Sequence, residues 1–136
     1  LILGWTSVEN AVNLEPLILY FGAIFWTLGY DTIYGFQDIK DDEIIGLKST
    51  SIKFKKKPYT FLFSCYLIFL INLFLTGFLM NFNKISLVVY VLIAVQMFYF
   101  QLKKLEIEDC SNCLKIFKSN NYLGLIVLIG LVIGKI

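Results

Sequence analysis

The chain has 136 residues, 58% of them hydrophobic, and a formal net charge of only +2 at pH 7. It contains no histidine, which removes the commonest zinc ligand and the usual catalytic base. Its twelve cations are all lysines that form neither an extended basic face nor a known nucleic-acid motif, so we exclude a nucleic-acid partner. The composition is instead that of an integral membrane protein.

The first apolar stretch, residues 1–8, is too short to cross a bilayer, and we interpret it as the tail of a truncated span. Residues 17–36 form a longer run in which Asp31 is the single charge. As a helix this run is about 30 Å long, which is the thickness of the hydrocarbon layer. A carboxylate in the last third of a span is costly unless it faces protein or water, so we expect Asp31 to point inward.

Three further apolar runs predict three more spanning helices, at about residues 59–80, 85–102 and 121–134. Asn120 and Asn121 stand where the last span begins, and their side chains could cap its first turn. We therefore predict an all-α integral membrane protein, built as a bundle of transmembrane helices.

The polar loops between these spans differ in their lysine content. Residues 31–58 hold six lysines and residues 101–121 hold four, whereas the turn at 81–84 holds one. Two crossings separate the lysine-rich loops, so both lie on one side of the membrane, and their excess of lysine assigns them to the cytoplasmic or mitochondrial matrix side. We expect the protein in the bacterial inner membrane or the mitochondrial inner membrane.

The loop at residues 31–58 also holds five of the ten carboxylates. Crowded carboxylates repel one another unless a cation neutralises them. If the segment is helical, Asp31, Asp38 and Asp42 fall within about 20° of one line, and the last two, one turn apart, could hold an ion between them. Such hard oxygen ligands suit Mg²⁺, which takes one or two carboxylates together with substrate phosphates. The alternative is a solvated loop whose charges only mark the membrane boundary.

The order of residues from Tyr30 to Asp42, continued by residues 45–50, resembles the second aspartate-rich motif of the UbiA-type membrane prenyltransferases. Within that family the segment is most similar to the 4-hydroxybenzoate polyprenyltransferases of ubiquinone synthesis. Gly35 stands where alanine is usual, a change that leaves the acids in place. A second pattern near the end of the chain also matches the family, at Phe117, Asn120, Asn121, Tyr122 and Gly124.

The resemblance implies the C-terminal part of a nine-helix fold, in which two aspartate-rich motifs face a lipid-open cavity and Mg²⁺ joins them to a polyprenyl diphosphate. Carried onto this chain, the implied site residues are the metal ligands Asp38 and Asp42, the further metal candidates Asp31 and Asp41, and the diphosphate contact Lys48. The two asparagines before the last span could contact a ligand or cap the helix, and both interpretations stay open.

The implied reaction is transfer of the polyprenyl group to the ring of 4-hydroxybenzoate. Another acceptor, such as homogentisate, a naphthoate or haem, is the alternative within the family, and a non-catalytic structural membrane subunit is the alternative outside it. An ion transporter would need a second buried carboxylate in the spans, and none is present. Because the family's first aspartate-rich motif is missing, we expect a C-terminal half from a truncated or split gene, inactive unless a partner chain supplies the rest.

Overall fold

The computed structural model describes residues 13–136, and within them every regular element is a helix. Residues 1–8, interpreted above as the tail of a span, lie outside the described residues. The elements in chain order are α2 (Leu14–Gly35), α3 (Ile39–Ile44), α4 (Thr50–Lys53), α5 (Pro58–Leu79), α6 (Ile85–Val95), the π-helical segment η1 (Gln96–Leu102) and α7 (Cys110–Lys135).

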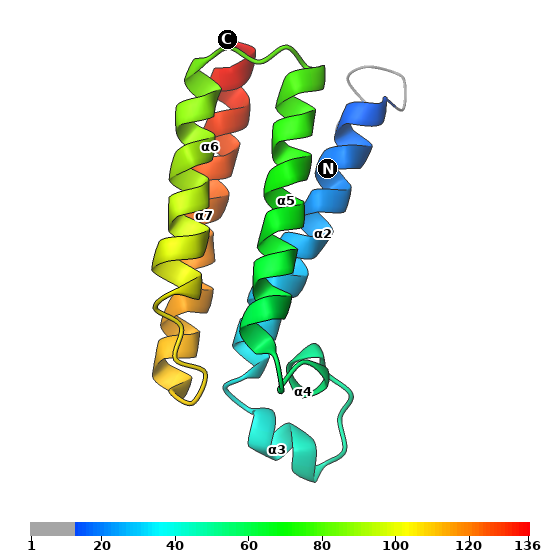
Figure 1. Ribbon diagram of the computed structural model, residues 1–136, viewed down its shortest axis with the longest axis vertical. Helices are drawn as coiled ribbons and strands as arrows, with labels where there is room; N and C mark the ends of the chain where they lie inside the picture. The colour runs from blue at the N-terminus through cyan, green and yellow to red at the C-terminus, as the bar shows by residue number, and fades with distance from the viewer. Residues whose placement is uncertain (1–12) are drawn as a thin grey trace.

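Four of these helical segments are long and apolar enough to cross a membrane: α2, α5, α6 continued by η1, and α7. They run side by side, and the short helices α3 and α4 lie together at one end of the bundle (Figure 1). The loop between η1 and α7 lies at that same end, whereas the turn between α5 and α6 lies at the other (Figure 1). The two lysine-rich segments therefore share one end of the molecule.

The fourth span differs from its expected extent, because α7 begins at Cys110 rather than near residue 121. Asp109 caps the helix, since its carboxylate accepts a hydrogen bond of 2.9 Å from the backbone N–H of Ser111. The first turns are amphipathic, and only the face that carries Cys113 and Ile116 is buried. Polar residues on the other faces make this stretch look like a loop in the sequence. The expected loop at residues 101–121 is therefore wrong over most of its length.

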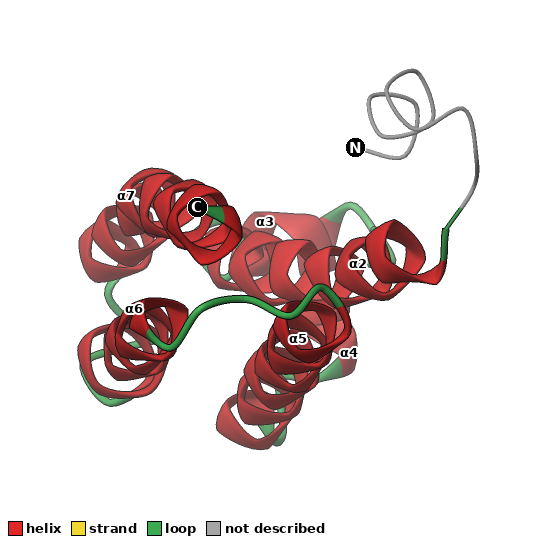
Figure 2. Cartoon of the chain, turned by 90° about the horizontal axis from the view of Figure 1, so that it is seen from above, coloured by secondary structure: helices red, strands yellow, loops and turns green. Residues whose placement is uncertain are grey.

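The bundle consists of two helix pairs, α2 with α5 and α6 with α7, which meet where α7 packs on α2 and where α5 packs on α6 and η1. Helix α2 packs most extensively against α5, while α7 packs against both α6 and α2 (Figure 2). The buried face of α5 carries side chains three, four and seven residues apart, among them Leu62, Tyr66, Phe69 and Leu73. Helix α2 meets this face with Gly29, where an added Cβ would lie only 2.8 Å from the Tyr66 ring. A small residue is therefore needed for the two backbones to approach this closely.

The third span changes its geometry near its polar end, where α6 gives way to the wider turn of η1. Met97 and Gln101 are both fully buried in this segment, although they are four residues apart. The i→i+5 bonding of a π-helix widens the turn, and in this segment both side chains face the interior.

Gln101 is the centre of a buried hydrogen-bond network that reaches all four spans. Its Oε1 accepts a bond of 2.6 Å from the Tyr66 hydroxyl, and its Nε2 donates to Ser119 Oγ at 3.2 Å and to Asn120 Oδ1 at 3.1 Å. Asn120 Oδ1 also accepts a bond of 3.0 Å from the indole N–H of Trp26. Helices in lipid gain little by burying apolar surface against one another, so such bonds help to hold the bundle together.

We predict that Gln101→Leu destabilises the bundle by about 1–3 kcal/mol, because the Tyr66 hydroxyl and the Asn120 amide each lose a partner in an apolar interior. The free energy of unfolding of the purified protein in detergent measures this. Gln96→Leu is the matched control, since Gln96 lies in the same segment and its side chain makes no hydrogen bond to the described residues. Equal stability of the two variants would contradict the prediction.

Candidate functional site

The acidic segment after α2 is not one continuous helix. Helix α2 ends at Gly35, and its last bonds tighten to the i→i−3 pattern, with Phe36 N–H donating to Ile33 O at 3.3 Å and Gln37 N–H to Tyr34 O at 3.0 Å. A new helix, α3, starts only at Ile39. The angle calculated for an unbroken helix therefore does not apply, and the common line expected for the three aspartates is absent.

Gly46 ends α3 and turns the chain back. Its φ of +72° is a left-handed conformation that glycine adopts without strain. Gly46 N–H donates to Glu43 O at 3.3 Å and Leu47 N–H donates to Asp42 O at 2.9 Å, which is the bonding of a Schellman cap. Lys48 follows Leu47 directly, so this turn ties the backbone just before Lys48 to the backbone of Asp42.

The end of the segment then binds back to its beginning. Thr32 Oγ1 donates to Leu28 O at 2.6 Å and lies 2.7 Å from Thr50 Oγ1. Since the Thr32 proton is used on Leu28, Thr50 is the donor in the contact between the two hydroxyls. Ser51 Oγ adds a bond of 3.2 Å to the carbonyl oxygen of Thr32. Residues 32–51 therefore form a closed loop in which α4 is held against the last turns of α2.

Gly35 is where this loop closes most tightly. An added Cβ there would overlap the hydroxyl of Ser51, which is itself 1% exposed. The alanine expected at this position from the family resemblance would therefore force the Ser51 hydroxyl away from its bond to the Thr32 carbonyl. In this chain Gly35 and Ser51 fit each other.

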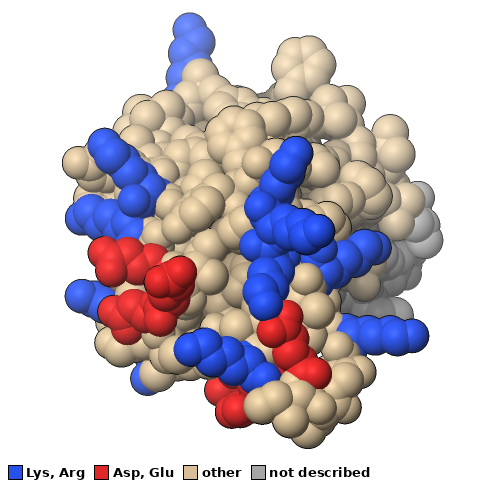
Figure 3. Space-filling model, turned by 60° about the horizontal axis from the view of Figure 1, so that its bottom comes forward, with Lys and Arg blue, Asp and Glu red and all other residues tan. Residues whose placement is uncertain are grey.

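The carboxylates lie along this loop rather than in one cluster. Asp31 is on α2, Asp38 is the residue before α3, and Asp41 and Asp42 are in its first turn. Asp31, Asp38 and Asp41 are exposed and Asp42 is half-buried, so the inward orientation expected for Asp31 is not seen among the described residues. Figure 3 shows the acidic side chains of this end of the molecule, those outside the loop included, in separate groups with lysines between them.

The residues that fit a metal ion are therefore fewer than expected. Within residues 13–136, no three His, Cys, Asp or Glu side chains lie close enough together to hold one. Asp38 and Asp42 remain one helical turn apart, as the bond of 2.9 Å from Asp42 N–H to Asp38 O shows. Two carboxylates at this spacing fit Mg²⁺, which takes its other ligands from water and substrate phosphates.

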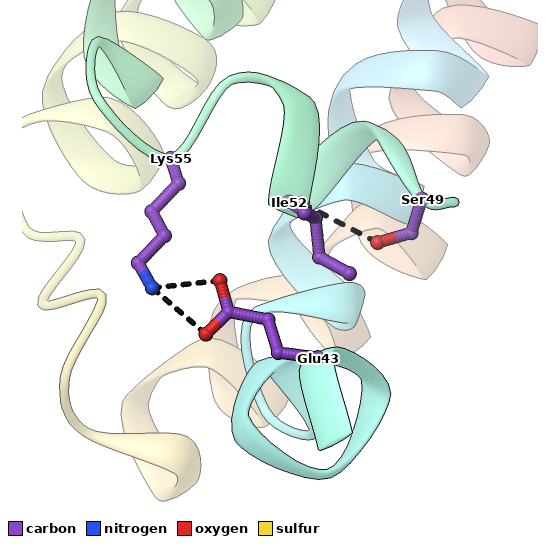
Figure 4. Close-up of polar contacts among 4 residues, drawn as sticks. All are labelled: Glu43, Ser49, Ile52 and Lys55. Atoms are coloured by element: carbon purple, nitrogen blue, oxygen red, sulfur yellow. Dashed lines mark hydrogen bonds and ion pairs between the residues drawn. The ribbon is translucent and has the colours of Figure 1, made fainter. Parts of the chain in front are cut away.

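One acid of the loop is engaged in an ion pair. Glu43 accepts two bonds from the Lys55 ammonium, of 2.7 and 2.8 Å, while Ser49 Oγ caps α4 by accepting a bond of 3.3 Å from Ile52 N–H (Figure 4). The ion pair is exposed, so it adds at most about 1 kcal/mol to stability. Its effect is positional, because it links α3 to the chain that follows α4.

The two asparagines expected at the start of the last span lie in the third turn of α7 or beyond, so the cap interpretation is wrong. Asn120 is buried in the network around Gln101, whereas its neighbour Asn121 is exposed. Sequence reasoning did not assign Gln101 or Trp26 any role beyond filling a span. A polar amide inside an apolar run is the signal that could have pointed to Gln101, because such a group needs partners in lipid.

We predict that Thr50→Val, which keeps the shape of the side chain but removes its hydroxyl, loosens α4 from α2. Hydrogen exchange of the backbone amides at residues 50–57 should become faster, because the contact to Thr32 that holds this turn is lost. Thr60→Val, at an exposed position of α5, is the control. Unchanged exchange in the first variant would show that the hydroxyl contact does not hold the loop closed.

Comparison with known proteins gives consistent similarities. The model of the "UbiA prenyltransferase family" matches residues 1–126. A mitochondrial 4-hydroxybenzoate polyprenyltransferase of Bos taurus is 36% identical over 137 residues, which cover 99% of this chain and 36% of the relative. A 4-hydroxybenzoate octaprenyltransferase of Francisella tularensis subsp. novicida is 32% identical over 139 residues, which cover 100% of this chain and 48% of the relative. The chain thus spans between a third and a half of the length of these curated relatives. No solved structure matches the chain significantly.

Proposed function

The chain belongs to the UbiA prenyltransferase family, and from this premise we propose that it forms part of an enzyme that transfers a polyprenyl group from its diphosphate to the ring of 4-hydroxybenzoate, in ubiquinone biosynthesis. The closed loop of residues 32–51 is the observation that supports this proposal best. Backbone bonds join Asp42 to Asp38, and Leu47, the residue before Lys48, to Asp42, at one end of four apolar spans. We propose that a water-soluble diphosphate binds at this end while its polyprenyl tail stays in the lipid.

The proposed reaction needs a bound metal ion, a positive contact to the diphosphate, and an environment that protects the allylic cation from water. Asp38 and Asp42 would hold Mg²⁺, with Asp31 and Asp41 as further candidates, and Lys48 would contact the diphosphate as a compact positive charge. When bound, the metal neutralises the diphosphate as negative charge grows on it. The aromatic side chains of the spans keep water from the allylic carbon and stabilise its positive charge. The bond between the allylic carbon and the diphosphate oxygen breaks, and diphosphate leaves. The ring carbon of the acceptor forms the new bond to the allylic carbon and then loses its proton.

The other half of the metal site is proposed to come from sequence that corresponds to the part of the relatives beyond this chain, in the same polypeptide or in a partner chain. The lysine-rich end of the bundle is proposed to face the cytoplasm or the mitochondrial matrix, because lysines are retained on that side. The segments at residues 36–57 and 103–109 both lie at this end, and only the first carries the proposed site residues (Figure 1).

We predict that Asp38→Asn and Asp42→Asn each lower kcat/KM for prenyl transfer by a factor on the order of 10² to 10³ in the full-length native protein, because each removes a charge that holds the metal. Lys48→Met should mainly raise KM for the polyprenyl diphosphate. Chelation of divalent ions should abolish turnover, and added Mg²⁺ should restore it in the wild type at lower concentrations than in the aspartate variants.

Glu108→Gln is the control, because Glu108 is an exposed acid at the same end of the bundle but outside the loop. Its activity should match that of the wild type. If the two aspartate variants are equally active, the acids mark only a membrane boundary and the chain acts as a structural subunit.

A further inference from the structure

A hollow of about 380 Å³ lies between α2 and α7, lined by Trp26, Tyr30, Phe117, Asn120, Asn121 and Gly124. We propose that this hollow holds the aromatic ring of the prenyl acceptor and that the side-chain amide of Asn121 bonds a polar substituent of that ring. The inference rests on the proposed function, and it assigns to α7 a role in choosing the acceptor that the acidic loop does not explain.

The walls of the hollow are aromatic and held in place by neighbouring rings. Trp26 stacks on Phe69, with ring centroids 5.1 Å apart and planes inclined by 26°. Phe117 lies 5.8 Å from Tyr30 and 4.8 Å from Tyr34, measured between ring centroids. Rings prefer offset or tilted neighbours at such distances, so a flat aromatic ligand finds partners that are already ordered.

The two adjacent asparagines have different roles. Asn120 has no capacity left for a ligand, because its Oδ1 accepts bonds from Trp26 and Gln101 and its Nδ2 donates to the carbonyl oxygens of Ile116 and Phe117. Asn121 is exposed, and its amide makes no hydrogen bond to the described residues. Its two donors and its acceptor therefore remain available in a hollow that Trp26, Tyr30 and Phe117 also line.

This combination favours an aromatic acid or phenol over the polyprenyl chain. A volume of about 380 Å³ is at the lower end of the range of small-molecule sites, roughly 300–1,000 Å³. A wholly apolar chain would bury the Asn121 amide without a partner, which costs free energy. A ring with hydroxyl or carboxylate substituents would pair with this amide. Tyr30 immediately precedes Asp31, so the hollow begins next to the acidic segment where the diphosphate is proposed to bind.

Gly124 keeps the hollow open. An added Cβ at this position would come 3.4 Å from Cη2 of Trp26, which is an ordinary contact, so an alanine would fit and a larger side chain would extend into the space in front of the indole. Gly124 is thus the position from which the hollow can be filled without disturbing the buried network.

The test is equilibrium binding of radiolabelled 4-hydroxybenzoate to the purified full-length protein, without Mg²⁺ and without polyprenyl diphosphate. We expect Asn121→Leu to weaken binding about tenfold, the effect of one lost hydrogen bond. Gly124→Leu should abolish binding by filling the hollow. Tyr122→Leu is the matched control, because this exposed neighbour lies outside the hollow and its loss should not alter the affinity.

A second measurement separates a lost site from a misfolded protein. KM for the polyprenyl diphosphate, measured with saturating acceptor, should stay within about twofold of the wild type in Asn121→Leu, since the acidic loop is untouched. Normal 4-hydroxybenzoate binding by both hollow variants would overturn the inference while prenyl transfer still supports the proposed function. Tighter binding of polyprenyl diphosphate by Asn121→Leu would assign the hollow to the prenyl chain. This result would also overturn the inference. A wild type that neither binds nor prenylates an aromatic acid would overturn both.

Discussion

A contact of 2.7 Å between two threonine hydroxyls closes the acidic loop at the lysine-rich end of this protein. Thr32 is on the last turns of a spanning helix and Thr50 begins α4, and most of the residues between them are exposed. Without this contact and the bond from Ser51 to the Thr32 carbonyl oxygen, Asp38, Asp41 and Asp42 would lie on a flexible segment in water. The contact joins the two ends of the loop. The Schellman turn at Gly46 and the exposed ion pair of Glu43 then add further bonds to a loop that is already closed.

The spans beneath this loop are held by a different kind of interaction. Apolar side chains gain little from leaving lipid for protein, so close backbone approach at Gly29 and the hydrogen bonds around Gln101 carry much of the specificity of packing. The network also orders the hollow between α2 and α7. Because Asn120 is bonded to Trp26 and Gln101, the rotation of α7 about its axis is set, and Asn121 is left at the edge of the aromatic hollow.

Much of the architecture could be read from local features. The runs at residues 17–36, 59–80 and 85–102 correspond to spanning helices because length and apolarity are properties of the segment itself. The angular alignment of Asp31 with Asp38 and Asp42 could not be read in this way. It assumed an unbroken helix, whereas the chain leaves the helix at Phe36, a side chain that is 2% exposed and anchored in the core. The helix thus ends at a residue whose side chain packs in the core, and the pattern of the segment alone does not show this.

The sequence by itself determined that this is a membrane-spanning helical chain, which segment carries the acids, and to which family it belongs, because composition and a long motif are local. Only the tertiary structure decided where α7 begins, how the acidic segment closes, and which of two adjacent asparagines is available. Those outcomes depend on contacts between distant residues, such as Trp26 with Asn120, and no short window of sequence contains both partners.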